Sequence, residues 1–75
     1  MPTEKELEKL KLLGARVKKL RLQKGLTQKD LAHSINKDTQ SINRLEVGGI
    51  NPSYLYLAEI SEGLGVRIAE LLGEL

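Results

Sequence analysis

Apolar residues follow one another at steps of three and four along the first third of the chain, the spacing of one face of an α-helix. Thr3, with Glu6 three positions later, has the pattern of a capping box, and Gly25 suits the left-handed backbone that ends many helices. Together these signals predict a helix that begins after Thr3 and runs to about Lys24. Its apolar stripe consists of Leu7, Leu10, Leu13, Val17 and Leu20.

Two short helices are predicted next, separated by only three residues. Thr27, again with an acidic residue three positions on, begins a helix over about 27–35. Asn36 ends this helix, because Asn tolerates the left-handed region better than any residue except Gly. Asp38 is a good N-cap for a third helix over 39–46, which a pair of glycines stops. The residues expected to face inward are Leu31, Ala32, Ile35, Ile42 and Leu45.

The last third of the chain predicts two more helices. Ser53 caps the first of them and Gly65 ends it, and a short helix over about 67–72 follows. No segment shows the alternation of a β-strand. The sequence therefore predicts an all-α protein, a compact five-helix bundle. The apolar residues of the last two helices are Leu57, Ile60, Leu64, Ile68 and Leu71.

The domain organisation follows from Gly14, which interrupts the first apolar stripe. We divide the chain into an N-terminal extension of the first helix, residues 1–12, and a domain over residues 13–72. Leucines at both ends exceed what a small core needs. We expect them to fold back on the domain or to contact a second chain. They are Leu7, Leu10, Leu12, Leu72 and Leu75.

The residue types present exclude several classes of function. There is no cysteine and His33 is the only histidine, so the chain alone cannot assemble a zinc or iron site of the usual ligand number. No nucleophile–base pair stands out, and we predict neither enzyme activity nor a cofactor. No apolar run approaches the roughly 20 residues that span a bilayer, and the polar N-terminus is not a secretion signal. We expect a soluble cytoplasmic protein.

Charge is distributed unevenly along the chain. Residues 1–26 carry eight Lys and Arg against three Glu, a balance of +5, whereas residues 51–75 carry one Arg against four Glu, a balance of −3. A basic end and an acidic end allow one face to be turned toward a polyanion. From charge alone, an ordinary solvated surface explains the pattern equally well.

The predicted helix 39–46 carries unusual chemistry on its outer side. Short helices joined by a three-residue turn cross at a wide angle, which is the geometry of a helix-turn-helix over about 27–46. Gln and Asn side chains pair bidentately with adenine in the major groove of DNA, and Arg pairs with guanine. The alternative is a plain solvated helix face. The outward residues are Thr39, Gln40, Asn43 and Arg44, with Lys37 and Ser41 at the edges.

A family resemblance supports the DNA-binding interpretation. The run RVKKLRLQKGLTQKDLA, residues 16–32, resembles the start of the lambdoid-phage repressor and Cro type of helix-turn-helix domain, the XRE family. The segments SINRLEVG, residues 41–48, and NPS, residues 51–53, keep the register of that family. The resemblance covers about residues 13–72 and implies a lambda-repressor-like fold.

The resemblance also implies roles for single residues. Gln28 matches a glutamine that contacts a phosphate and braces the recognition helix. Arg21 and Glu46 match a buried salt bridge between the first and third helices, and a guanidinium–carboxylate fork is the arrangement that tolerates burial. An unpaired phosphate contact is the alternative for Arg21. The positions implied to read bases are Thr39, Gln40, Asn43 and Arg44, whereas Ser41 is implied to touch the DNA backbone.

This chain departs from the family pattern in four places, one of which is Arg67, where a capping Ser or Thr is common. Asn36 stands where Gly is usual, and Lys37 stands where an apolar residue is usual. The loop after the third helix has no basic residue, although relatives often place Lys or Arg there. We expect the backbone N–H groups of Gly48 and Gly49, and of the helix start at Ser53, to contact phosphate instead.

The function predicted from these observations is a sequence-specific transcriptional regulator, most simply a repressor that binds double-stranded DNA as a homodimer. Two alternatives stay open. The chain is also consistent with the antitoxin of a toxin–antitoxin pair, in which a toxin protein would be a partner. It is equally consistent with the controller protein of a restriction–modification system.

Overall fold

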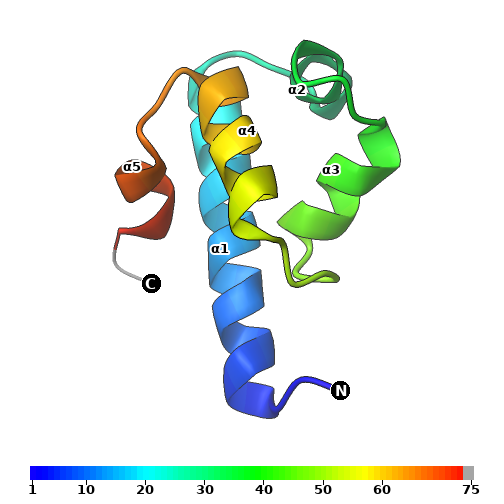
Figure 1. The fold of residues 1–75 in the computed structure, drawn as a ribbon, viewed down its shortest axis with the longest axis vertical. Helices are drawn as coiled ribbons and strands as arrows, with labels where there is room; N and C mark the ends of the chain where they lie inside the picture. The colour runs from blue at the N-terminus through cyan, green and yellow to red at the C-terminus, as the bar shows by residue number, and fades with distance from the viewer. Residues whose placement is uncertain (74–75) are drawn as a thin grey trace.

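Five α-helices arranged around the long first helix make up the fold in the computed structural model, which describes residues 1–73. Helix α1 runs the length of the molecule, with α4 in front of it, α3 on one side and α5 on the other (Figure 1). Residues 1–73 contain no strand, so the all-α prediction is confirmed. The helices are α1 (Glu4–Gln23), α2 (Gln28–Ser34), α3 (Thr39–Glu46), α4 (Tyr54–Leu64) and α5 (Ile68–Leu72).

The predicted helix starts are confirmed by their capping hydrogen bonds. At α1, Thr3 Oγ1 accepts from the Glu6 N–H at 3.2 Å, and Glu6 Oε1 accepts from the Thr3 N–H at 2.7 Å. The same reciprocal pair, Thr27 with Asp30, begins α2 with two bonds of 3.0 Å. At α3, Asp38 Oδ1 accepts from the Ser41 N–H at 2.7 Å. Side chains thus satisfy N–H groups that the first turn of a helix leaves without a partner.

The Asp30 cap makes stability depend on pH. Hydrogen bonds from Thr27 hold the pKa of the Asp30 carboxyl below its ordinary value of 3.8. Its contribution is therefore complete above that value and is lost as the pH falls through the lower pKa of the folded protein. We expect Asp30→Asn to melt below the wild type at pH 7, and the difference in melting temperature to disappear at the acidic end of a titration. A difference that stays constant down to pH 2 would contradict this cause.

The turn between α2 and α3 has the backbone that the sequence indicates. Asn36 adopts φ 57°, in the left-handed region, and the Lys37 N–H donates to the Ala32 carbonyl at 2.8 Å. This bond closes the last turn of α2 and lets the chain reverse toward the Asp38 cap. Asn36 therefore takes the place that glycine usually fills in the family.

The core lies where all five helices meet, and each of them contributes at least one buried residue. Most of the expected inward residues are buried, whereas Leu7 is 36% exposed and Leu10 is half-buried. Both lie on the first turns of α1, which project beyond the other helices (Figure 1). Helix α1 continues without a break through residue 13, and the division at that point stays a prediction. The core residues are Leu13, Val17, Leu31, Ala32, Ile42, Leu45, Leu57, Ile60, Leu64 and Leu71.

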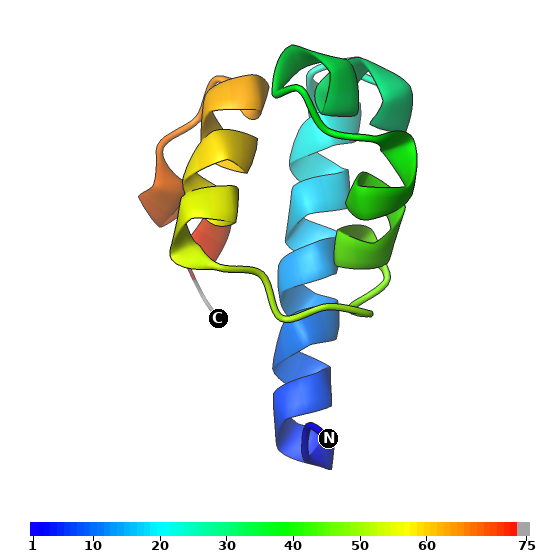
Figure 2. The same cartoon turned by 45° about the vertical axis from the view of Figure 1, so that its right-hand side comes forward.

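Gly14 lies where α1 crosses α3, which Figure 2 shows side by side. A Cβ atom on Gly14 would lie 2.4 Å from the carbonyl oxygens of both Leu45 and Glu46. Real Cβ atoms do not approach oxygen so closely, and the crossing therefore requires glycine. The interruption of the apolar stripe is thus the contact point that lets α3 lie close against α1.

Arg16 attaches α5 to α1. Its Nη2 donates to the Gly73 carbonyl at 2.9 Å and its Nη1 donates to the Glu70 carbonyl at 3.3 Å. A cation at the C-terminal end of a helix also complements the helix dipole. This contact holds α5 on the side of α1 opposite α3 (Figure 1).

In the part of the chain described, no helix is both long and apolar enough to cross a membrane.

Candidate nucleic-acid interface

Helix α3 buries one side and presents the other to solvent. Ile42 and Leu45 are 0% and 1% exposed and hold the helix against the core. Among residues 1–73, no other helix or loop lies over its outer side (Figure 2). Polar side chains that could reach the edges of bases therefore stand free on a helix whose backbone is fixed. The exposed residues on this side are Thr39, Gln40, Asn43 and Arg44.

The C-terminal end of α3 is anchored by a buried ion pair. Arg21 Nε donates to Glu46 Oε2 at 2.7 Å and Arg21 Nη2 donates to Glu46 Oε1 at 3.1 Å, a bidentate fork. The two side chains are 7% and 2% exposed. A third guanidinium nitrogen, Nη1, donates to the Leu26 carbonyl at 2.7 Å. The hydrogen bonds that Arg21 donates to Glu46 raise the pKa of Arg21 despite the opposing effect of burial, so the pair stays ionic.

Gln28, the first residue of α2, also contacts this buried ion pair. Its Nε2 donates to Glu46 Oε1 at 3.0 Å. One carboxylate therefore holds residues from α1 and α2 against the last turn of α3. This is the bracing geometry that the family resemblance implies for Gln28. Its contact with phosphate stays a prediction.

The two predicted residues at the edge of α3, Ser41 and Lys37, are already engaged with α4. Ser41 Oγ lies 2.7 Å from the hydroxyl oxygen of Tyr56. Lys37 Nζ lies 3.7 Å from Glu59 Oε1 and 5.7 Å from the centroid of the Tyr56 ring. An exposed ion pair of this kind contributes little to stability and leaves the ammonium free to exchange partners. Sequence reasoning missed this contact between Tyr56 and Ser41, because nothing in the helical spacing indicates which residue of α4 meets α3.

The backbone N–H groups of Gly48 and Gly49, which we expected to contact phosphate, already donate hydrogen bonds within the chain. The Gly48 N–H donates to the Leu45 carbonyl at 3.2 Å, and the Gly49 N–H donates to the Arg44 carbonyl at 2.8 Å. The expectation that this glycine pair offers its amides to phosphate is therefore wrong. The last carbonyls of a helix need donors, and the two glycines supply them by closing α3.

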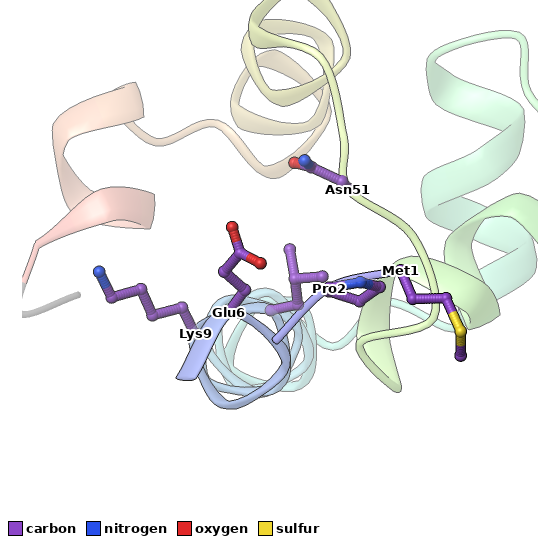
Figure 3. Close-up of a pocket in the computed structure, with 6 residues that line it drawn as sticks. Met1, Pro2, Glu6, Lys9 and Asn51 are labelled. Atoms are coloured by element: carbon purple, nitrogen blue, oxygen red, sulfur yellow. The ribbon is translucent and has the colours of Figure 1, made fainter. Parts of the chain in front are cut away.

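A shallow pocket lies away from α3, between the first turns of α1 and the loop that precedes α4 (Figure 3). Glu6 and Lys9 rise from α1, and Asn51 extends from the loop across the pocket. Met1, Pro2 and Leu10 supply apolar walls. The described residues bring together no group of three His, Cys, Asp or Glu side chains that could hold a metal ion.

Two short helices that cross after a four-residue connection, residues 35–38, the second with a polar and exposed outer side, define a helix-turn-helix protein. A family profile described as helix-turn-helix matches residues 17–71. The chain belongs to this XRE-type helix-turn-helix family, as the sequence predicts.

Relatives of this chain include regulators and solved controller proteins. It is 37% identical over 62 residues to y4dJ of Sinorhizobium fredii, described as an uncharacterized HTH-type transcriptional regulator, covering 83% of this chain and 80% of that protein. The restriction–modification controller protein C.AhdI of Aeromonas hydrophila has a TM-score of 0.81 at 31% identity, covering 83% and 94% of the two chains. The controller protein C.Esp1396I, solved as a tetramer on its 35 base-pair operator, has a TM-score of 0.75 at 35% identity, covering 85% and 95%.

Proposed function

We propose that this protein is a sequence-specific regulator of transcription, acting as a repressor, that reads the major groove of double-stranded DNA with α3. The observation that carries the proposal is the contrast between the two sides of one helix. The inner side is fixed by buried contacts, and the outer side presents unshielded amide, hydroxyl and guanidinium groups. Their hydrogen-bonding patterns suit the edges of bases.

Each side chain on α3 is assigned a role in this proposal. Gln40 and Asn43 pair with adenine through their amides, and Arg44 pairs with guanine through N7 and O6. Thr39 reads an adjacent base from the first turn. The groups assigned to the sugar–phosphate backbone, which fix register on the duplex, are Gln28, Lys37 and Ser41.

We further propose that the protein acts as a homodimer on a two-fold operator. With few basic groups near α3, one subunit neutralises only about two to four phosphates, so a single subunit binds weakly at physiological salt. Two subunits would place their recognition helices about 34 Å apart, one turn of DNA. The oligomer of C.Esp1396I on its operator supports this arrangement. So do exposed leucines away from α3, namely Leu7, Leu12 and Leu72; Leu75 lies outside the described residues.

Substitution of the reading residues tests the proposal. We expect Gln40→Ala and Arg44→Ala each to weaken binding to the preferred site by about 1–3 kcal/mol and to relax preference at one base pair. The measurement is selection from random duplex DNA at fixed salt, followed by titration of the selected site.

The matched controls for this test carry the same residue types elsewhere. Gln23 and Arg67 are exposed and lie outside α3, and Gln23→Ala and Arg67→Ala should leave the selected sequence unchanged. If the Gln40→Ala and Arg44→Ala variants select the same sequence as the wild type, α3 is not the reading helix.

A role as the controller protein of a restriction–modification system is the second candidate. The likeness to C.AhdI and C.Esp1396I over most of each chain supports it. A selected site that occurs upstream of adjoining restriction and modification genes would support this role, and its absence there would favour a general repressor. None of the three relatives named above is described as an antitoxin, and the toxin partner stays a prediction.

A further inference from the structure

The two ends of α3 are held by different means. At the C-terminal end, Glu46 is fixed by Arg21 and Gln28, and Gly14 lets α1 lie against the last turn. The first turn has no buried polar anchor of this kind, because its cap comes from Asp38 in the same segment. This turn carries two of the proposed reading residues, and its position therefore depends on contacts from other helices.

One contact from α4 reaches the first turn of α3. Helix α3 packs against α1 and α2, and its backbone comes close to α4 at few points. Figures 1 and 2 both show the ribbons of α3 and α4 apart. Among the described residues, the pair between Ser41 Oγ and the Tyr56 hydroxyl, 2.7 Å apart, is the only hydrogen bond between the two helices.

Tyr56 is itself well fixed. Its backbone N–H donates to Ser53 Oγ at 3.1 Å, which places it in the capped first turn of α4. Its ring is half-buried and packs against the core, with the Lys37 ammonium 5.7 Å from the ring centroid. The side chain therefore connects the stable end of α4 to the turn of α3 that Ser41 occupies.

The hydroxyl pair persists across the physiological pH range. Burial raises the pKa of the Tyr56 hydroxyl above its ordinary value of 10.0, and the carboxylates of Asp38 and Glu59 also raise it, while the hydrogen bond with Ser41 acts in the opposite direction. Tyr56 therefore remains neutral, and either hydroxyl can donate to the other.

We propose that Tyr56 is a positioning residue that sets the sequence specificity of α3, acting through Ser41 to hold the first turn at a fixed depth in the groove. This inference rests on the proposed function. A hydrogen bond to a base edge is sensitive to distance and angle, and a first turn free to shift forms such bonds with more than one base. Loss of the Tyr56 hydroxyl should therefore reduce discrimination most at the base pairs read by Thr39 and Gln40, and least at those read by Asn43 and Arg44.

Tyr56→Phe tests this role, with Tyr54→Phe as the matched control. Tyr54 lies two residues away on the same helix, is 67% exposed, and its hydroxyl makes no hydrogen bond with any other of residues 1–73. The quantity measured is the ratio of the dissociation constants for a duplex with one changed base pair and for the selected duplex, at fixed salt. We expect Tyr56→Phe to lower this ratio about three- to tenfold, the effect of one hydrogen bond. Tyr54→Phe should leave the ratio unchanged, and the affinity for unrelated duplex should stay as in the wild type.

A double-variant cycle separates positioning from a direct contact of Tyr56 with DNA. If Tyr56 acts through Ser41, adding Tyr56→Phe to Ser41→Ala should cause no further loss of discrimination. Additive losses would overturn the inference, as would a uniform loss of affinity on every duplex, which indicates a contact with phosphate. A wild type that prefers no sequence would refute the proposed function itself. A selective wild type with an equally selective Tyr56→Phe variant would refute only the role of Tyr56.

Discussion

Replacing Gly14 with alanine is expected to destabilise the protein by about 3 kcal/mol or more, because an added Cβ overpacks the crossing of α1 and α3. The methyl group would lie 2.4 Å from the Leu45 and Glu46 carbonyl oxygens, which are backbone atoms and cannot rotate away. The two helices would have to separate, and α3 would lose its contact with the core. Urea unfolding followed by circular dichroism measures the change.

The direction of this effect is informative because helix propensity predicts the opposite. Alanine in the interior of a helix is about 1 kcal/mol more favourable than glycine. Ala15, the next residue along α1, is exposed, and Ala15→Gly should cost about that amount and no more. A Gly14→Ala variant that is more stable than the wild type would show that the crossing has room for a methyl group.

Removing the carboxylate of Glu46 should cost about 3–5 kcal/mol, because it leaves the buried guanidinium of Arg21 without its partner. A domain of this size has a free energy of unfolding of only about 4–11 kcal/mol. Glu46→Ala is therefore expected to lose a large share of its stability and to melt well below the wild type. Thermal and urea unfolding measure the loss, and Glu62→Ala, at an exposed carboxylate on α4, should change stability by less than about 0.5 kcal/mol.

A double variant distinguishes an unpaired charge from a simple loss of packing. Replacing a buried ion pair by apolar residues of similar volume is often neutral or stabilising. We therefore expect Arg21→Met with Glu46→Leu to recover most of the stability that Glu46→Ala loses. If the double variant is as unstable as Glu46→Ala, the unpaired charge is not the main cause of the loss, and the hydrogen bonds and packing of the Arg21–Glu46 pair also stabilise the fold.

Local signals in the sequence predicted the backbone well. The capping residues and the turn at Asn36 each act within three or four positions, so their chemistry can be read from neighbouring residues. The boundaries of α3 follow from Asp38 on one side and the Gly48–Gly49 pair on the other. These elements formed where they were expected because each has its own start and stop signal.

Contacts between distant helices could not be derived from spacing alone. Tyr56 meets Ser41 across 15 positions, and Arg16 reaches the Gly73 carbonyl across 57. Periodicity shows which side of a helix faces inward, but not which residue of another helix lies opposite. The close approach at Gly14 was missed for the same reason, because the spacing indicated only a break in the apolar stripe.

The residues on the outer side of α3 are not needed to hold the fold together, and they are the residues proposed to recognise DNA. Within residues 1–73, the side chains of Thr39, Gln40, Asn43 and Arg44 form no hydrogen bond or ion pair with the rest of the chain. Residues at these four positions can therefore be exchanged with little effect on folding, while Gly14, Arg21 and Glu46 keep the scaffold in place. If these residues read bases as proposed, a library varied only there would yield proteins of one shape that bind many different operators.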